Sequence, residues 1–204
     1  MIRNSNTWAL LQRLKPVSMY IKDMSEQVKE KAKDTADYSL EQDPTQNRNQ
    51  VLNRCYIAMM AEQIVVEAVH GFLPCGSEDF DNPYSFAYDV VAKDGVRIEV
   101  KTHQSDSKWI NVHTGMSGDY PSEVPGINLG PFLKHKLSDL IIIFDSKANG
   151  SGGILFTPKI LAGLDAFSTS SPLVKKSQFN PGYYLSEPRV GMEDFNFHQF
   201  TKTI

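Results

Sequence analysis

Three ionisable residues in one short segment have the types and the spacing of a hydrolytic site. Asp89 stands in an apolar stretch, and Glu99 and Lys101 follow it after a turn-forming triplet at 93–95. Because Glu99 and Lys101 are two residues apart on an expected strand, their side chains project from the same face of a sheet. A hairpin about the turn would place Asp89 beside them. The spacing therefore predicts two carboxylates and one ammonium in a small polar island beside an apolar sheet.

Such a group has a defined chemical use. Carboxylate oxygens and the backbone carbonyl of Val100 are hard ligands that suit Mg²⁺, with Mn²⁺ as a substitute. A cation held there can turn a water molecule into the nucleophile at a phosphodiester. Lys101 can position or help to deprotonate that water, and can offset charge on the phosphoryl oxygens. The alternative is structural: Asp89 turns or caps a strand, while Glu99 and Lys101 form an exposed ion pair worth about 0–1 kcal/mol.

The segment around these residues resembles the core of the PD-(D/E)xK nuclease superfamily, whose members share the restriction-endonuclease-like fold. Asp89 matches the first acid of that family's pattern, Glu99 the second acid and Lys101 the lysine. Tyr88 stands where the name of the pattern has proline, a departure that is common in the superfamily. The resemblance covers roughly Val51 to His103 and continues more weakly beyond that range.

This resemblance implies a metal-dependent DNA endonuclease with Asp89, Glu99 and the Val100 carbonyl as Mg²⁺ ligands, and with Lys101 orienting and activating water. Restriction, repair, recombination and phage or mobile-element DNA processing are the processes open to such an enzyme. RNA is an alternative substrate, and a homodimer would supply the two sites that cutting both strands requires. Two other interpretations stay open: a catalytically silent nucleic-acid-binding or protein-interaction module that keeps the fold, and a scaffold protein with a chance motif. The intact set of two acids and a lysine argues against the silent module.

Members of the superfamily usually have a helix before the first core strand, often with a glutamate that faces the metal site. Glu62 fits this position on physical grounds, because it is the single charge on an apolar helical stripe. That stripe consists of Cys55, Ala58, Met59, Glu62, Val65, Val66 and Val69. A lone carboxylate on a buried stripe is costly unless it is paired or metal-bound. We therefore expect Glu62 to bind water or a second metal; a glutamate at the edge of the stripe, or one paired with an arginine, is the alternative.

Other polar residues are weaker candidates for the site. Asp79 or Asp81 would be the first metal ligand if the strand register differs. His103, at the end of a strand, is expected to make a structural hydrogen bond rather than to contact phosphate. Lys108 beside Trp109 pairs a cation with an aromatic ring, a combination used on nucleic acid. The other basic residues that could contact a DNA backbone are Lys134, His135, Lys136, Lys175 and Lys176.

The elements that must position these residues follow from periodicity and turn signals. We expect a mixed-charge, solvated helix at 19–38, a strong helix at Gln50–His70, and short helices at 132–137 and 158–164. Strands are expected at 86–92, 96–102, 109–113, 140–144 and 154–156, with a glycine-rich turn at 149–153 and a long loop at 115–131. The predicted fold is an α/β domain at 46–204 with a restriction-endonuclease-like mixed central sheet flanked by helices, preceded by an N-terminal helical extension at 1–45.

Composition and charge limit the possible classes of protein. The chain has 204 residues, 41% hydrophobic and 22% charged, which is typical of a soluble globular domain. The net charge of −3 argues against non-specific coating of nucleic acid. The longest apolar run, Leu140–Phe144, is too short to cross a bilayer, and no apolar signal segment begins the chain, so we expect a cytoplasmic protein with no membrane partner. Cys55 and Cys75 form no CxxC pair, and no nucleophile-elbow or phosphate-loop motif is present.

Overall fold

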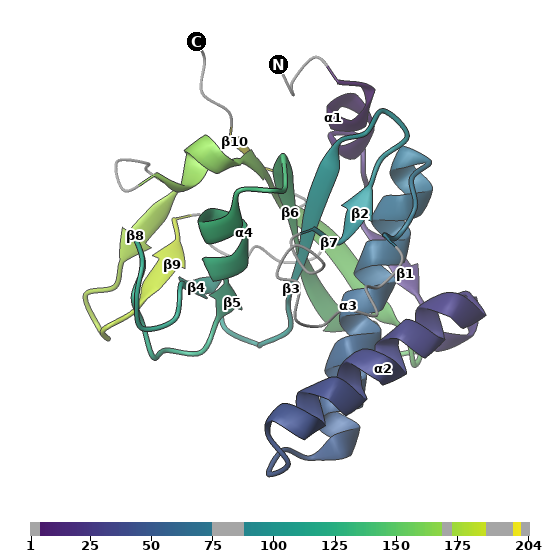
Figure 1. Ribbon diagram of the computed structural model, residues 1–204, viewed down its shortest axis with the longest axis horizontal. Helices are drawn as coiled ribbons and strands as arrows, with labels where there is room; N and C mark the ends of the chain where they lie inside the picture. Colours follow the sequence, from purple (N-terminus) through teal and green to yellow (C-terminus); the bar gives the residue numbers. More distant parts are fainter. Residues whose placement is uncertain (1–4, 75–87, 169–172, 187–197, 201–204) are drawn as a thin grey trace.

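The computed structural model describes residues 5–74, 88–168, 173–186 and 198–200. It is a mixed α/β structure built on two sheets (Figure 1). The main sheet has the strand order β1-β7-β6-β3-β2, and β10 also pairs with β7. Its strands are β1 (Val17–Met19), β2 (Val90–Val91), β3 (Arg97–His103), β6 (Leu140–Ala148), β7 (Ile154–Gly163) and β10 (His198–Phe200). Strands β3 and β6 run parallel, whereas β6 and β7 form an antiparallel hairpin.

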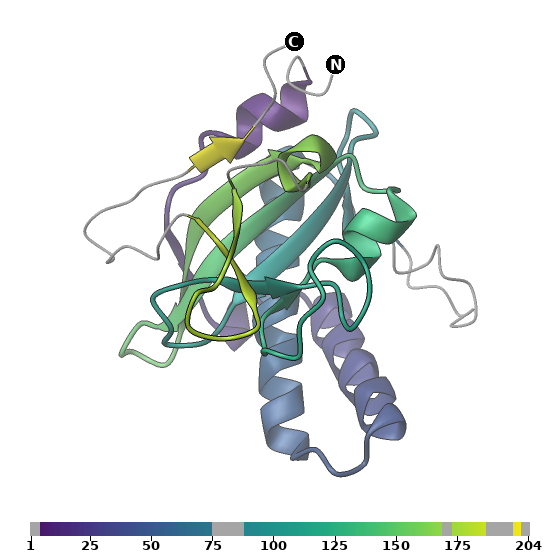
Figure 2. The same cartoon turned by 90° about the vertical axis from the view of Figure 1, so that its left-hand side faces the viewer.

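A smaller sheet and a short helix cover one face of the main sheet, and three helices cover the other (Figures 1 and 2). The smaller sheet has the order β5-β4-β9-β8. Its strands are β4 (Asn111–His113), β5 (Ile127–Asn128), β8 (Val174–Lys176) and β9 (Tyr183–Leu185), and the helices are α1 (Asn6–Leu11), α2 (Glu26–Gln42), α3 (Arg48–Val69) and α4 (Gly130–His135). Two apolar cores result, because Ile98 and Ile142 pack toward the long helices while Ile141 and Ile143 pack toward the smaller sheet.

Helix α3 confirms the strong helix expected at Gln50–His70. It begins where the Asn47 side chain accepts a hydrogen bond from the Gln50 N–H at 3.1 Å. It ends at His70, whose φ of 50° is in the left-handed region. The next residue is Gly71, where a β-carbon would collide with the carbonyl oxygen of Val91. A glycine at this position therefore allows the end of α3 to lie directly against β2.

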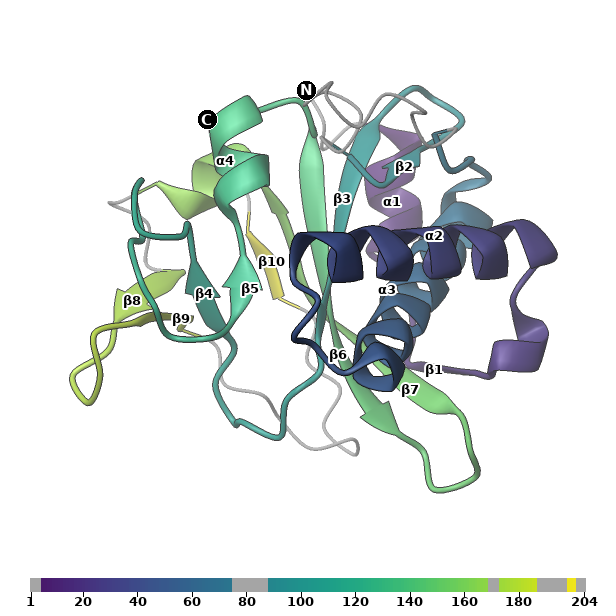
Figure 3. The ribbon, with the colours of Figure 1, turned by 60° about the horizontal axis from the view of Figure 1, so that its bottom comes forward.

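Helix α2 packs across α3 (Figure 3) and is only partly the solvated helix that its charges predicted. Its first turn is capped by Ser25, whose hydroxyl accepts a hydrogen bond from the Val28 N–H. Val28, Ala32 and Ala36 are buried at steps of four residues, whereas the charged Lys33 and Asp34 are exposed. The mixed charges thus lie on the outer face of α2, and the small apolar residues lie on the face that contacts α3.

The hairpin predicted around 93–95 is present between β2 and β3. Val90 pairs with Ile98 and Val91 with Arg97, and Gly95 has the positive φ of 81° that the turn requires. The second strand has the predicted alternation, with Ile98 buried toward the helices. The first strand is shorter than predicted: β2 begins at Val90, one residue after Asp89, and residues 86 and 87 lie outside the described part of the chain.

The helix expected at 158–164 is wrong, because this segment continues strand β7 as far as Gly163. Proline lacks a backbone N–H and disfavours the middle of a sheet. Here the register with β6 shifts: Phe144 pairs with Pro158 and Ile143 with Ile160, so that one extra residue, Lys159, is accommodated in β7. The bulge admits the proline without ending the strand. Strands β6 and β7 are both longer than predicted, and the turn between them at 149–153 is confirmed.

The N-terminal segment contains two helices, α1 and α2, but the helix expected at 19–38 begins only at Glu26, and the segment also supplies a strand. Strand β1 pairs antiparallel with β7, and Trp8 and Leu11 of α1 are buried in the core beside α3. The predicted boundary at 45–46 falls in the connection between α2 and α3. The α/β class with a mixed sheet is confirmed, and the restriction-endonuclease-like arrangement stays a prediction. In the part of the chain that the structure describes, no helix has the length and hydropathy to cross a membrane.

Candidate active site

The site is built on an edge of β3 that β2 leaves uncovered. Pairing of the two strands stops at Ile98, whose carbonyl accepts a hydrogen bond from the Asp89 N–H at 2.9 Å. The Asp89 side chain then continues the contact, because its Oδ2 accepts a hydrogen bond from the Val100 N–H at 2.7 Å. The N–H and C=O of one strand residue point to the same side. The carbonyl of Val100 therefore faces the edge on which the Asp89 carboxylate lies.

Lys101 lies between the two predicted carboxylates. Its Nζ is 2.5 Å from Glu99 Oε1 and 3.9 Å from Asp89 Oδ2. The Glu99 side chain is only 2% exposed, whereas those of Lys101 and Asp89 are 27% and 22% exposed. Ser138 donates a further hydrogen bond to Glu99 Oε2 at 3.4 Å. The structure thus brings Asp89, Glu99 and Lys101 together as their spacing predicted, with one carboxylate buried and the other two groups reaching solvent.

Glu62 approaches the same group from α3. Its side chain is 6% exposed, and its Oε2 lies 3.1 Å from Nζ of Lys31 on α2. Burial raises the pKa of Glu62, the charge of Asp89 adds to the rise, and the charges of Lys31 and Lys101 oppose it. Pairing with an arginine was the alternative considered for Glu62, and the structure pairs it with a lysine instead, while the expected binding of water or a second metal stays a prediction. Sequence reasoning missed Lys31, although the buried Val28 and Ala32 flank it and mark the inner face of α2.

Burial raises the pKa of two carboxyl groups in this cluster. It acts first on Glu62 and Glu99, and the nearby charge of Asp89 adds to it, so that their pKa values rise to about 8 and about 7. For Lys101, burial lowers the pKa, but Asp89 and Glu99 outweigh that effect and raise it. Lys101 therefore stays charged at neutral pH, and the cluster favours additional positive charge.

The donor set fits a small divalent cation. Mg²⁺ is commonly bound by one or two carboxylates, with water and substrate phosphate completing its octahedron. Asp89 and Glu99 provide the carboxylates and Val100 a carbonyl oxygen on the same edge. Within the described ranges, no three or more His, Cys, Asp or Glu side chains form a group that could hold a metal ion. The fit is thus to a hydrated ion with two carboxylate ligands rather than to an all-protein cage.

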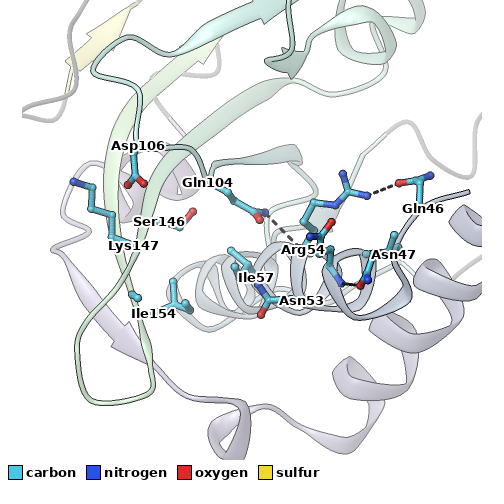
Figure 4. A pocket seen from close by; sticks show the side chains of 13 residues that line it. Gln46, Asn47, Asn53, Arg54, Ile57, Gln104, Asp106, Ser146, Lys147 and Ile154 are labelled. Atoms are coloured by element: carbon cyan, nitrogen blue, oxygen red, sulfur yellow. Dashed lines mark hydrogen bonds between the residues drawn. The ribbon is translucent and has the colours of Figure 1, made fainter.

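A pocket of about 650 Å³ lies near the end of β3, where the chain runs on from Lys101 (Figure 4). It is formed by the first turns of α3, the residues after β3 and the β6–β7 hairpin. Two cationic side chains, Arg54 and Lys147, line it together with several amides. Arg54 donates a hydrogen bond to Gln46 Oε1 at 2.6 Å, and the Gln104 amide donates to the Arg54 carbonyl at 3.4 Å. The pocket thus offers hydrogen-bond donors and two positive charges, with one carboxylate, that of Asp106, among its lining residues.

Comparison with known proteins places the chain in a family. Its residues 1–187 match the family model described as Bacteriophage T4 endonuclease IV. It is also 44% identical to Endonuclease IV of Enterobacteria phage T4 over 182 residues, which cover 86% of this chain and 96% of that protein. The chain belongs to the bacteriophage T4 endonuclease IV family. The matched range of this T4 endonuclease IV family member includes Lys31, Glu62, Asp89, Glu99 and Lys101. No solved structure matches it.

The remaining predicted residues of this T4 endonuclease IV family member have other positions in the fold, and two of them fall outside the described residues. His103 is buried, with Nδ1 3.4 Å from Asp145 Oδ1 and Nε2 2.8 Å from Ser105 Oγ, which confirms the structural role expected for it. Asp79 and Asp81 fall outside the described residues. The basic residues Lys134 and His135 form the last turn of α4, Lys136 follows it, and Lys175 and Lys176 lie on β8.

Proposed function

We propose that this protein is a metal-dependent DNA endonuclease of the PD-(D/E)xK type. The observation that carries the proposal is the contact of Lys101 with both Asp89 and Glu99 at an uncovered strand edge, with the buried Glu62 on the neighbouring helix α3. Membership of a family described as an endonuclease supports the reaction class. The order of the elements also supports it. The glutamate comes from the helix before the hairpin, the first acid directly precedes the first strand of the hairpin, and the last two groups lie in the second strand.

In this proposal Asp89, Glu99 and the Val100 carbonyl hold Mg²⁺, with Mn²⁺ as a substitute. The ion supplies polarisation of the scissile phosphate and of a water molecule when it is bound. The Val100 N–H fixes the orientation of the Asp89 carboxylate before substrate arrives, so little reorganisation is needed. Ser138 acts in the same way on Glu99.

The two other groups have different tasks. Because the pKa of Lys101 is raised, its ammonium orients the attacking water and stabilises negative charge on the phosphoryl oxygens, rather than taking a proton. Glu62, whose carboxyl pKa is raised by burial, would bind that water or a second metal ion. Arg54 and Lys147 in the neighbouring pocket contact backbone phosphates and fix the register of the strand.

The test is cleavage by the purified protein. Supercoiled plasmid, linear DNA and RNA are incubated with Mg²⁺, with Mn²⁺ or with EDTA, using wild type, Lys101→Ala and Lys93→Ala. Lys93 is an exposed lysine in the β2–β3 turn and serves as the matched control. We expect nicked or linear plasmid only with metal, with at least a 100-fold lower rate in Lys101→Ala and an unchanged rate in Lys93→Ala.

Four results would contradict the proposal in whole or in part. Cleavage that persists in EDTA would exclude a metal requirement. Cleavage that is unchanged in Lys101→Ala would exclude the proposed active site. Failure of the folded protein to cut any of the substrates favours the silent nucleic-acid-binding module. Cleavage of RNA alone would replace the substrate and keep the chemistry. Sedimentation of the protein with and without DNA tests the homodimer that cutting of both strands would use.

A further inference from the structure

The smaller sheet has one face that does not pack against the apolar core. Side chains alternate between the two faces of a strand, and Ile110, Val112 and Leu185 point into the apolar core beneath the sheet. The residues that alternate with them are Trp109 and Asn111 before and in β4, and Tyr184 in β9. Asn111 pairs with Tyr184, and Tyr184 pairs with Lys175 of β8. Aromatic, amide and lysine side chains therefore share the outer face.

Three aromatic side chains on this side of the sheet form what is called here the aromatic platform: Trp109, Tyr184 and Phe179. The rings of Trp109 and Tyr184 meet at a centroid distance of 5.1 Å and an angle of 61°. Trp109 is 39% exposed and Phe179 is 98% exposed. All three line a hollow of about 350 Å³. A phenylalanine this exposed gains almost nothing from the fold, so its place beside two other rings calls for a ligand.

Two lysines flank the aromatic platform. Nζ of Lys108 lies 5.7 Å from the centre of the Trp109 ring, and Lys175 stands opposite Tyr184. The residues that line the hollow include Asn111, Asn180 and Gln178 but no carboxylate. Flat apolar rings, amides and flanking ammonium groups suit a planar heterocycle joined to phosphates. They do not suit an aliphatic or acidic partner.

We propose that the aromatic platform stacks an unpaired nucleobase of the strand that is held at the candidate active site, with Lys108 and Lys175 against its phosphates. Bases in a duplex hide their faces in the stack, so only an unpaired base can enter. Between Lys101 and Trp109 the chain passes Gln104 and Asp106, which line the pocket of Figure 4, so a segment of eight residues connects the candidate active site with the aromatic platform. That the same strand is cut rests on the proposed function; the stacking itself does not.

The experiment uses the fluorescence of Trp109. The chain has two tryptophans, and the other, Trp8, is buried in the core at 4% exposure. The Trp8→Phe variant therefore reports Trp109 alone. It is titrated in EDTA with a ten-residue oligothymidylate and with a blunt-ended duplex of equal phosphate content. We expect quenching by the single strand and little by the duplex.

Affinity is then measured by anisotropy of a labelled oligothymidylate. Stacking of one base is worth about 1–3 kcal/mol, so Trp109→Ala is expected to weaken binding about 5- to 150-fold. Phe179→Ala should weaken it less, and Trp109→Phe should retain most of it. Phe72→Ala removes an aromatic ring that is also exposed, at 58%, but lies beside β2, and serves as the matched control. Circular dichroism verifies the fold of each variant.

The outcomes separate the two proposals. If the single strand does not quench the fluorescence of Trp109, and Trp109→Ala and Phe72→Ala bind with equal affinity, the proposal of base stacking is overturned. This holds whatever the nuclease assay gives. Equal quenching by single strand and duplex also overturns it, because the contact is then not with a base face. If the single strand quenches Trp109 but no nucleic acid is cleaved, the proposal of base stacking stands and the proposed nuclease activity is refuted.

Discussion

At Glu99 the fold holds a carboxylate where water cannot stabilise its charge. The side chain is almost fully buried, and Asp89 adds repulsion that Lys101 only partly offsets, which is why the pKa rises to about 7. Groups placed for catalysis are often unfavourable for stability. The arrangement at Glu99 is an instance that can be measured.

We expect Glu99→Gln to raise the free energy of unfolding by about 0.5–2 kcal/mol while abolishing cleavage. The amide keeps an oxygen that can accept the Ser138 hydrogen bond, and it removes a charge that burial and Asp89 disfavour. Urea unfolding in EDTA measures the first effect and plasmid nicking the second. Glu123→Gln, at an exposed position, should change neither. A less stable Glu99→Gln that still cuts would contradict the expectation.

The sequence alone was sufficient to predict which residues of the hairpin form the site. It was insufficient to predict the residues that contact them from other elements. Asp89, Glu99 and Lys101 lie on one hairpin, where the turn and the two-residue period fix their positions relative to each other. Lys31 and Ser138 reach the site from 31 and 39 positions away. Those contacts depend on how α2 crosses α3 and on how β6 enters the sheet. In a sequence, Lys31 looks like any lysine of a mixed-charge helix.

At the scale of elements, the contact between α2 and α3 is partly electrostatic. Lys31→Ala would leave Glu62 buried without its cation, and we expect a loss of about 1–2 kcal/mol. The loss is smaller than for a fully buried pair because Lys31 is 29% exposed. Lys33→Ala, on the exposed face, should cost less than half as much. Combining Lys31→Ala with Glu62→Gln should restore most of the loss in thermal unfolding, and equal losses in the single and double variants would refute the pairing.

Helix α1 is tied to the β2–β3 turn by one carboxylate. The Thr7 hydroxyl and N–H donate to the two oxygens of Asp94 at 2.5 and 3.1 Å. Burial raises the pKa of Asp94, but these hydrogen bonds outweigh it and lower the pKa below its usual value. A lowered carboxyl pKa adds stability above the unfolded value of about 3.9, and this stability is lost as the pH falls further.

We therefore expect Asp94→Asn to be about 1 kcal/mol less stable than wild type at pH 7. The difference should shrink toward zero below about pH 4, where wild-type Asp94 becomes protonated. Unfolding curves at pH 7, 5 and 3.5 measure it. Asp106→Asn, at an exposed position, is the control and should show a smaller difference at every pH. A difference that grows on acidification would contradict the assignment.

Strand β7 shows where element prediction from sequence fails. The segment from Pro158 to Ala162 has a sequence typical of the first turn of a helix, because proline is common at the first helical position. The competing fact is the bulge opposite Ile143 and Phe144, which allows the proline to stay in a strand. A bulge depends on the register with β6, and a single sequence does not show that register. The β2–β3 turn could be predicted because its glycine carries a local signal.

For the whole molecule, a net charge of −3 means that attraction to DNA must come from local groups. We expect Arg54→Ala to weaken binding of a labelled DNA and to reduce the slope of log K against log salt by about 1, as for the loss of one phosphate contact. Arg13→Ala removes an equal charge from an exposed position before β1 and should leave the slope unchanged. Equal slopes for both variants would remove Arg54 from the binding surface.

Strand β7 also sets an order of events during synthesis. It pairs with β6 on one side and with β1 on the other, so that Val17 meets Phe156 across most of the chain. Strand β3 pairs with the two-residue strand β2 on one side and with β6 on the other. Strand β6 in turn pairs with β7 on its other edge. At about 5–20 residues per second, a ribosome reaches Gly163 roughly 3–12 s after Lys101. The carboxylates that would hold the cation are therefore made early but assembled late, so a nascent chain carries no working site for those seconds.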